Sequence, residues 1–147
     1  MIRVVLDTNQ IVSAIINPKG LSDAILMSSG LKGDQKYELV ASEDILIEIK
    51  KILNYPRLKK LHGWSEKKID LFLNLLKEHA YVADTLHLHD KFALSDTEDD
   101  KFFHAAIQTE ASYIVSRDTH LLKIREYKEV RVLKPEVFIS AMKNNTL

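Results

Sequence analysis

Acidic residues stand at four places in this chain where a fold could gather them for chemistry. Asp7 follows the first short apolar run of the sequence, and Asp118 follows a later one. Asp99 and Asp100 open a helical pattern, and Glu48 flanks the apolar stripe of another. Ligands of parallel sheets bind beyond the carboxyl ends of the strands. We therefore expect these acidic residues to converge at one sheet edge.

Carboxylates that gather without Lys or Arg partners repel one another, and a divalent cation removes that cost. The sequence contains no Cys, so a metal site would use oxygen or imidazole ligands. Mg²⁺ takes one or two carboxylates together with waters and substrate phosphate oxygens, and Mn²⁺ prefers similar ligands. The pattern thus favours a Mg²⁺ or Mn²⁺ site, and hydrolysis of a phosphodiester is the reaction that suits it.

Each of these residues also has a simpler explanation. Asp7, Thr8 and Asn9 are all types that cap helices or form turns. Acids at the start of a helix are stabilised by its dipole, by about 0.3–1 kcal/mol, without any metal. Glu48 could be a solvated partner of a neighbouring lysine. The metal hypothesis therefore depends on the acids occurring together.

The elements that must position these residues alternate along the chain. Apolar runs typical of buried strands cover residues 2–6, 37–41, 81–83, 112–116 and 130–133. Helical patterns separate most of these runs, and they start after Gly20, Ser42 and Ser65, at Asp99 and at Pro135. Pro56 is expected to end the second helix. This alternation predicts an α/β fold with three layers, a central and mainly parallel sheet flanked by helices.

Length and composition limit the class of protein. The chain has 147 residues, of which 46% are apolar and 29% charged, and we expect one globular domain over residues 1–147. No apolar run approaches the roughly 18 residues of a membrane span, and residues 1–7 do not resemble a secretory signal. A cytoplasmic location without a membrane partner is the expectation. The formal net charge is zero, so attraction of the whole molecule to nucleic acid is not predicted.

Four motifs follow one another over most of the chain. Their residues are 7–9 (DTN); Ser42, Glu48, Leu53 and 56–58 (PRL); 99–102 (DDKF) with 105–106; and 111–118 (ASYIVSRD) with 121–122. Their order and spacing resemble the PIN-domain ribonucleases, especially the bacterial and archaeal branch of toxin components of toxin–antitoxin systems (VapC-like). The resemblance implies a PIN-like domain that acts as a metal-dependent endoribonuclease.

The resemblance also implies roles for particular residues. The acidic residues of the family correspond to Asp7, Glu48, Asp100 and Asp118, which would bind Mg²⁺ or Mn²⁺. The family's spacing selects Asp100 over Asp99. Asn9 and Ser116 would orient the ligands or the attacking water through hydrogen bonds. Cleavage would leave a 5′-phosphate and a 3′-hydroxyl.

Partners follow from the same resemblance. RNA would be the substrate, a small antitoxin protein would cover the site in the toxin branch, and a homodimer is the expected assembly. Two alternatives remain open. A haloacid-dehalogenase-like phosphatase also starts with an Asp after its first strand, but it needs a second acid where this chain has Asn9. The other alternative is a PIN-like module that binds RNA or a partner without catalysis.

The charge is unevenly distributed along the sequence. Residues 50–60 contain five cations and no acid, and such a segment is most often a solvated helix face. Beside an acidic site, however, Lys59 and Lys60 could contact RNA phosphates, and Tyr55 could stack on a base. Arg117 is a further candidate for phosphate contact.

His87 and His89 alternate in a way that places both rings on one face of a strand. Ordinary surface packing explains this pair as well as metal binding does. We therefore assign no metal to these two residues.

Overall fold

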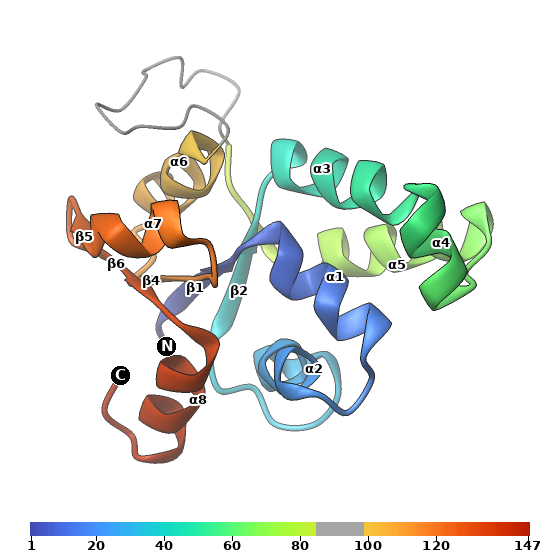
Figure 1. Ribbon diagram of the computed structural model, residues 1–147. Helices are drawn as coiled ribbons and strands as arrows, with labels where there is room; N and C mark the ends of the chain where they lie inside the picture. The colour runs from blue at the N-terminus through green and yellow to red at the C-terminus, as the bar shows by residue number, and fades with distance from the viewer. Residues whose placement is uncertain (85–98) are drawn as a thin grey trace.

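A computed structural model describes residues 1–84 and 99–147, and a six-stranded sheet lies at its centre. The strands are β1 (Arg3–Leu6), β2 (Glu38–Ala41), β3 (Tyr81–Val82), β4 (Tyr113–Val115), β5 (Glu126–Tyr127) and β6 (Val130–Leu133). Their spatial order is β3-β2-β1-β4-β6-β5, and only β5 pairs antiparallel to its neighbour (Figure 1). The predicted mainly parallel sheet is confirmed.

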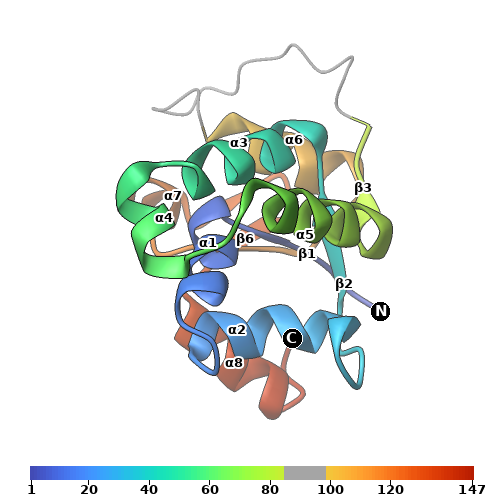
Figure 2. The ribbon, with the colours of Figure 1, turned by 90° about the vertical axis from the view of Figure 1, so that its right-hand side faces the viewer.

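The helices cover both faces of this sheet. They are α1 (Thr8–Ile16), α2 (Leu21–Leu26), α3 (Glu43–Leu53), α4 (Pro56–His62), α5 (Glu66–His79), α6 (Asp100–Gln108), α7 (Thr119–Ile124) and α8 (Pro135–Lys143), with a π-helical turn at Met27–Leu31. Figure 2 shows α5 and α6 on one side of the sheet and α2 and α8 on the other, which makes three layers. None of the helices in the described ranges is long and apolar enough to cross a membrane.

The central strand β1 is apolar at successive positions because both of its faces are covered. Val4 and Val5 are completely buried, and Leu6 is almost so. A strand in the interior of a parallel sheet needs apolar side chains at every position rather than at alternate ones. β1 pairs with β2 on one side and β4 on the other. The residue that follows β1, Asp7, therefore emerges in the middle of the carboxyl edge.

Ser42 and Ser65, after which the sequence predicts helices to start, each cap a helix of the structure. The Ser42 hydroxyl accepts a hydrogen bond from the backbone N–H of Ile45 at 3.3 Å. The Ser65 hydroxyl accepts one from the backbone N–H of Lys68 at 3.1 Å. Each bond satisfies an N–H group that the first turn of a helix leaves without an intrahelical partner. The starts of α3 and α5 are thus confirmed.

The sequence pattern does not predict α1, because it places the first helix after Gly20. Asp7 caps α1, and its carboxylate accepts a hydrogen bond from the backbone N–H of Asn9. Six of the nine residues of α1 are buried, which weakens the alternation between apolar and polar faces that marks a surface helix.

The sequence predicts that the second helix ends at Pro56, and α3 does end before it, at Leu53. The sequence does not predict α4, whose first residue is Pro56. Proline fits this position because the first N–H groups of a helix have no intrahelical partner. The chain therefore turns at Asn54 and Tyr55 and continues as a short helix beside the site.

Candidate active site

The neighbouring strands β1 and β4 bring two of the predicted acids to one edge of the sheet. Leu6 and Val115 are in register at the ends of these strands, and Asp7 donates its backbone N–H to the Val115 carbonyl at 2.9 Å. Asp118 lies three residues beyond β4 and caps α7, because its carboxylate accepts the backbone N–H of His120 at 2.8 Å. The acids at 7 and 118 thus stand on adjacent strand ends.

Asp7 is 6% exposed, and two hydrogen bonds fix its carboxylate. The buried Ser116 hydroxyl donates to Asp7 Oδ2 at 2.5 Å, and the Asn9 backbone N–H donates to Oδ1 at 3.3 Å. The same Ser116 oxygen accepts the backbone N–H of Asp118 at 2.9 Å. Ser116 therefore connects both acids, whereas Asn9 acts on Asp7 through its backbone and its side chain lines a neighbouring pocket.

Burial raises the pKa of Asp7 above its ordinary value. The hydrogen bonds from Ser116 and Asn9 oppose this shift, and the negative charges of Asp118 and Glu48 add to it. Such a carboxylate is costly to ionise in the absence of a compensating positive charge. A cation bound here would favour the ionised form, which makes Asp7 a candidate residue of a functional site.

Asp100 is the first residue of α6 and is also buried. Its Oδ1 atom has no hydrogen-bond partner among the described residues. A buried carboxylate oxygen without a partner is unfavourable, and it requires an explanation such as a ligand. The neighbouring Asp99 is only partly buried and makes no side-chain cap for the helix. The two residues therefore differ in burial, and the role of Asp100 as a metal ligand stays a prediction.

Glu48 makes an ion pair with Lys101, with 2.6 Å between its Oε2 atom and the lysine Nζ. The pair joins α3 to α6 and is only partly exposed, 27% on the glutamate side and 15% on the lysine side. The expectation that the acids gather without a Lys or Arg partner is therefore wrong for Glu48. Its charge nevertheless contributes to the raised pKa of Asp7.

The residues fit a hydrated oxygen-ligated cation. Within residues 1–84 and 99–147, no group of three acidic or histidine side chains is already assembled around a common point. Mg²⁺ does not require such a cage, because it keeps several waters and binds through one or two carboxylates. The fixed carboxylate of Asp7 and the unpartnered oxygen of Asp100 supply ligands of this kind.

Arg117 is engaged in an ion pair with Glu136 of α8, and both side chains are about half exposed. The hydrogen bond from Arg117 is the main cause that holds the pKa of Glu136 below its ordinary value. A phosphate contact by Arg117 would require this pair to separate. Lys59 and Lys60 are exposed in the last turn of α4. His87 and His89 lie outside the described residues.

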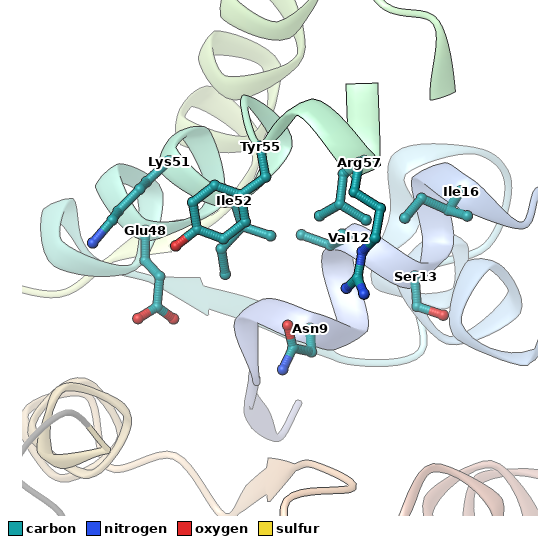
Figure 3. A pocket seen from close by; sticks show the side chains of 10 residues that line it. Asn9, Val12, Ser13, Ile16, Glu48, Lys51, Ile52, Tyr55 and Arg57 are labelled. Carbon is teal, nitrogen blue, oxygen red and sulfur yellow. The ribbon is translucent and has the colours of Figure 1, made fainter. Parts of the chain in front are cut away.

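A pocket of about 540 Å³ adjoins the acidic residues and shares Asn9 and Glu48 with them (Figure 3). Its walls come from α1, α3 and α4 and include Tyr55 and Arg57. The sequence pattern does not predict this pocket, because it does not predict α4, which forms one of its walls. The sequence does contain one signal for it, an aromatic residue, Tyr55, two residues before a cation, Arg57.

The fold and the acidic edge define the class of protein as an α/β domain with a mainly parallel sheet and carboxylates at the ends of its strands. Residues 3–120 match the family model of the PIN domain. The uncharacterized protein MJ1680 of Methanocaldococcus jannaschii is 33% identical over 126 residues, which cover 85% of this chain and 76% of that protein. The chain therefore belongs to the PIN domain family, whose members are generally nucleases that use divalent metals.

Proposed function

We propose that this protein is an endoribonuclease that hydrolyses phosphodiester bonds of RNA with the help of Mg²⁺ or Mn²⁺. Two buried carboxylates, at the starts of α1 and α6, are the observation that carries the proposal. Asp7 is fixed by Ser116, and Asp100 keeps an oxygen without a partner within the described chain. Membership in the PIN domain family supports this chemistry over that of a haloacid-dehalogenase-like phosphatase.

The metal would be held by Asp7, Asp100 and Asp118, with Glu48 nearby. When bound, it would lower the pKa of a water and stabilise charge on the leaving oxygen, giving a 5′-phosphate and a 3′-hydroxyl.

The protein's own contribution is to hold these ligands in place before substrate arrives. Ser116 fixes the rotamer of Asp7 and, through the backbone N–H of Asp118, the turn that carries the second acid. Asn9 adds a backbone hydrogen bond to Asp7, and its amide side chain faces the pocket, where it can orient a water or a phosphate. Polar groups that are already positioned need little reorganisation during the reaction.

The substrate's backbone is expected to run along α4. Lys59 and Lys60 are exposed there, and no ion pair holds either of them within the described part of the chain. Such lysines can contact RNA phosphates and keep the strand from being repelled by the carboxylates. Arg117 would join them only after release from Glu136.

The biological role that the family resemblance favours is that of the toxin in a toxin–antitoxin pair. As such, the protein would act in the cytoplasm as a single domain over residues 1–147, and a small antitoxin would cover the site. A homodimer is the proposed assembly. Ile47 of α3 and Leu71 and Leu75 of α5 support it, because they leave large apolar side chains at least half exposed on two helices in contact.

The experiment that tests the activity is incubation of the protein with a single-stranded RNA in Mn²⁺, with EDTA in a parallel reaction. Cleavage in Mn²⁺ that stops in EDTA is the expected result. Calorimetry with Mn²⁺ alone separates the proposal from a non-catalytic PIN-like module. The module predicts neither cleavage nor carboxylate-dependent metal binding.

A further inference from the structure

The pocket beside the acidic residues has the size and lining of a ligand site. Its volume of about 540 Å³ lies within the range of about 300–1,000 Å³ for small-molecule pockets. Val12 and Ile52 contribute apolar surface to its lining, and Asn9 and Glu48 are the lining residues that it shares with the acidic site. A group that enters it from the acidic site would pass from a polar end onto an apolar surface.

Tyr55 offers an open aromatic ring on the wall of this pocket. The side chain is 46% exposed, and the residue caps α4 without using its hydroxyl. Among the described residues no ring stacks on it, and none forms a hydrogen bond with its hydroxyl. Figure 3 shows the ring extending from the start of α4 toward the side of the pocket where Glu48 lies. Unstacked RNA bases pack on aromatic rings that are exposed in this way.

Two cations beside Tyr55 have no acidic partner among the residues that the structure describes. Lys51 and Arg57 both line the pocket, and neither makes an ion pair within the described ranges. The acid nearest to them along the pocket lining, Glu48, is already paired with Lys101. The pocket therefore carries uncompensated positive charge around an aromatic ring. This combination is complementary to a nucleotide, which joins a flat base to an anionic phosphate.

We propose that the pocket receives one base of a single-stranded RNA, stacked on Tyr55, with Lys51 and Arg57 in contact with the flanking phosphates. The base would belong to a nucleotide next to the phosphodiester that is cut, because Asn9 and Glu48 border both the pocket and the carboxylate site. The pocket would thereby select the sequence context of cleavage. This inference takes its substrate from the proposed ribonuclease function.

The test is a double-mutant cycle, in which the aromatic ring is removed from the protein and the base is removed from the RNA, separately and together. Binding of a fluorescein-labelled single-stranded RNA is measured by anisotropy in EDTA at low salt, for wild type, Tyr55→Leu and Tyr55→Phe. The RNA is then replaced by a series with one abasic nucleotide at each position in turn. Leu61→Ala, an exposed residue of α4 outside the pocket lining, is the matched control. Cleavage in Mn²⁺ is mapped in parallel.

Tyr55→Leu is expected to weaken binding of the intact RNA by about 5- to 150-fold, the range of one lost stacking contact. Tyr55→Phe and Leu61→Ala should bind as wild type does. The loss of affinity caused by Tyr55→Leu should vanish for the RNA whose abasic nucleotide adjoins the mapped cleavage site. It should persist for RNAs whose abasic nucleotide lies elsewhere.

Two other results are distinguishable. If RNA is cleaved but Tyr55→Leu binds it as wild type does, the pocket proposal is overturned, the nuclease proposal stands, and a protein segment becomes the candidate occupant. If the cycle shows coupling but Mn²⁺ supports no cleavage, the base site stands and the proposed activity is wrong.

Discussion

Ser116 and Asp7 lie 109 residues apart in the sequence, yet their buried side chains share a hydrogen bond of 2.5 Å. The bond joins the residue that follows β1 to the residue that follows β4. Because the same serine oxygen also accepts the backbone N–H of Asp118, one hydroxyl organises two of the three proposed metal ligands.

The first prediction concerns this hydroxyl. Ser116→Ala leaves the Asp7 carboxylate without its donor, and groups that orient metal ligands typically contribute about 10- to 100-fold to metal affinity or activity. We expect a loss of that size in Mn²⁺ affinity, measured by calorimetry, and in RNA cleavage. Ser140→Ala, at an exposed position of α8, is the control. Equal Mn²⁺ affinity in Ser116→Ala and wild type would show that the hydrogen bond has only a structural role.

The second prediction follows from the raised pKa of Asp7. A carboxyl group with a raised pKa in the folded state binds its proton more tightly there than in the unfolded chain. Its contribution to stability is therefore present below the ordinary pKa of 3.8 and is lost as pH rises through the folded value. Asp7→Asn cannot ionise, so it removes this loss of stability at higher pH. Its side-chain oxygen can still accept the hydrogen bond from the Ser116 hydroxyl.

We expect metal-free Asp7→Asn to gain stability over wild type between pH 4 and pH 7, as measured by urea unfolding at the two pH values. Asp34→Asn, an exposed acid remote from the site in sequence, should show no such pH-dependent difference. A difference between Asp7→Asn and wild type that stays constant across this range would contradict the assigned direction of the pKa shift.

The third prediction concerns the ion pair between Lys101 and Glu48. Lys101→Met removes the positive charge from the site and leaves Glu48 uncompensated, so Mn²⁺ affinity should rise by a few-fold while stability without metal falls. Lys77→Met breaks a similar pair, with Glu43, elsewhere between α5 and α3 and serves as the matched control. If both variants bind Mn²⁺ equally, Glu48 does not belong to the metal site.

The fourth prediction concerns the exposed lysines of α4. Each phosphate contact contributes about 0.7 to the slope of log K against log salt for single strands. The double variant Lys59→Ala/Lys60→Ala should therefore flatten this slope by about 1.4 if both lysines contact RNA. Lys67→Ala/Lys143→Ala removes two exposed lysines from other helices. If the Lys59→Ala/Lys60→Ala variant has the same slope as wild type, these two lysines are a solvated surface and do not contact RNA.

Much of the fold could be predicted from local patterns. The apolar run before Asp7 marks a strand covered on both faces, and Ser42 and Ser65 mark helix starts through their hydroxyls. Since parallel strands end at the same edge, the positions of Asp7 and Asp118 followed from those strands.

Features that depend on contacts between distant segments could not be predicted. The partners of Glu48 and Arg117 come from other helices, so spacing along the chain does not reveal them. The pocket depends on α4, and the pattern around Pro56 reads equally as the end of one helix or the start of the next. The buried, unpartnered oxygen of Asp100 is likewise a property of packing.

The most direct test of the metal-dependent nuclease site compares RNA cleavage by wild type, Asp7→Asn, Asp118→Asn and Asp34→Asn across a Mn²⁺ titration that starts in EDTA. Both site variants keep nearly the same side-chain volume but lose the charge that a cation requires. They should remain folded and cleave no RNA at any Mn²⁺ concentration, whereas Asp34→Asn should match wild type. Cleavage by Asp7→Asn at the wild-type rate, with the same Mn²⁺ dependence, would contradict the site.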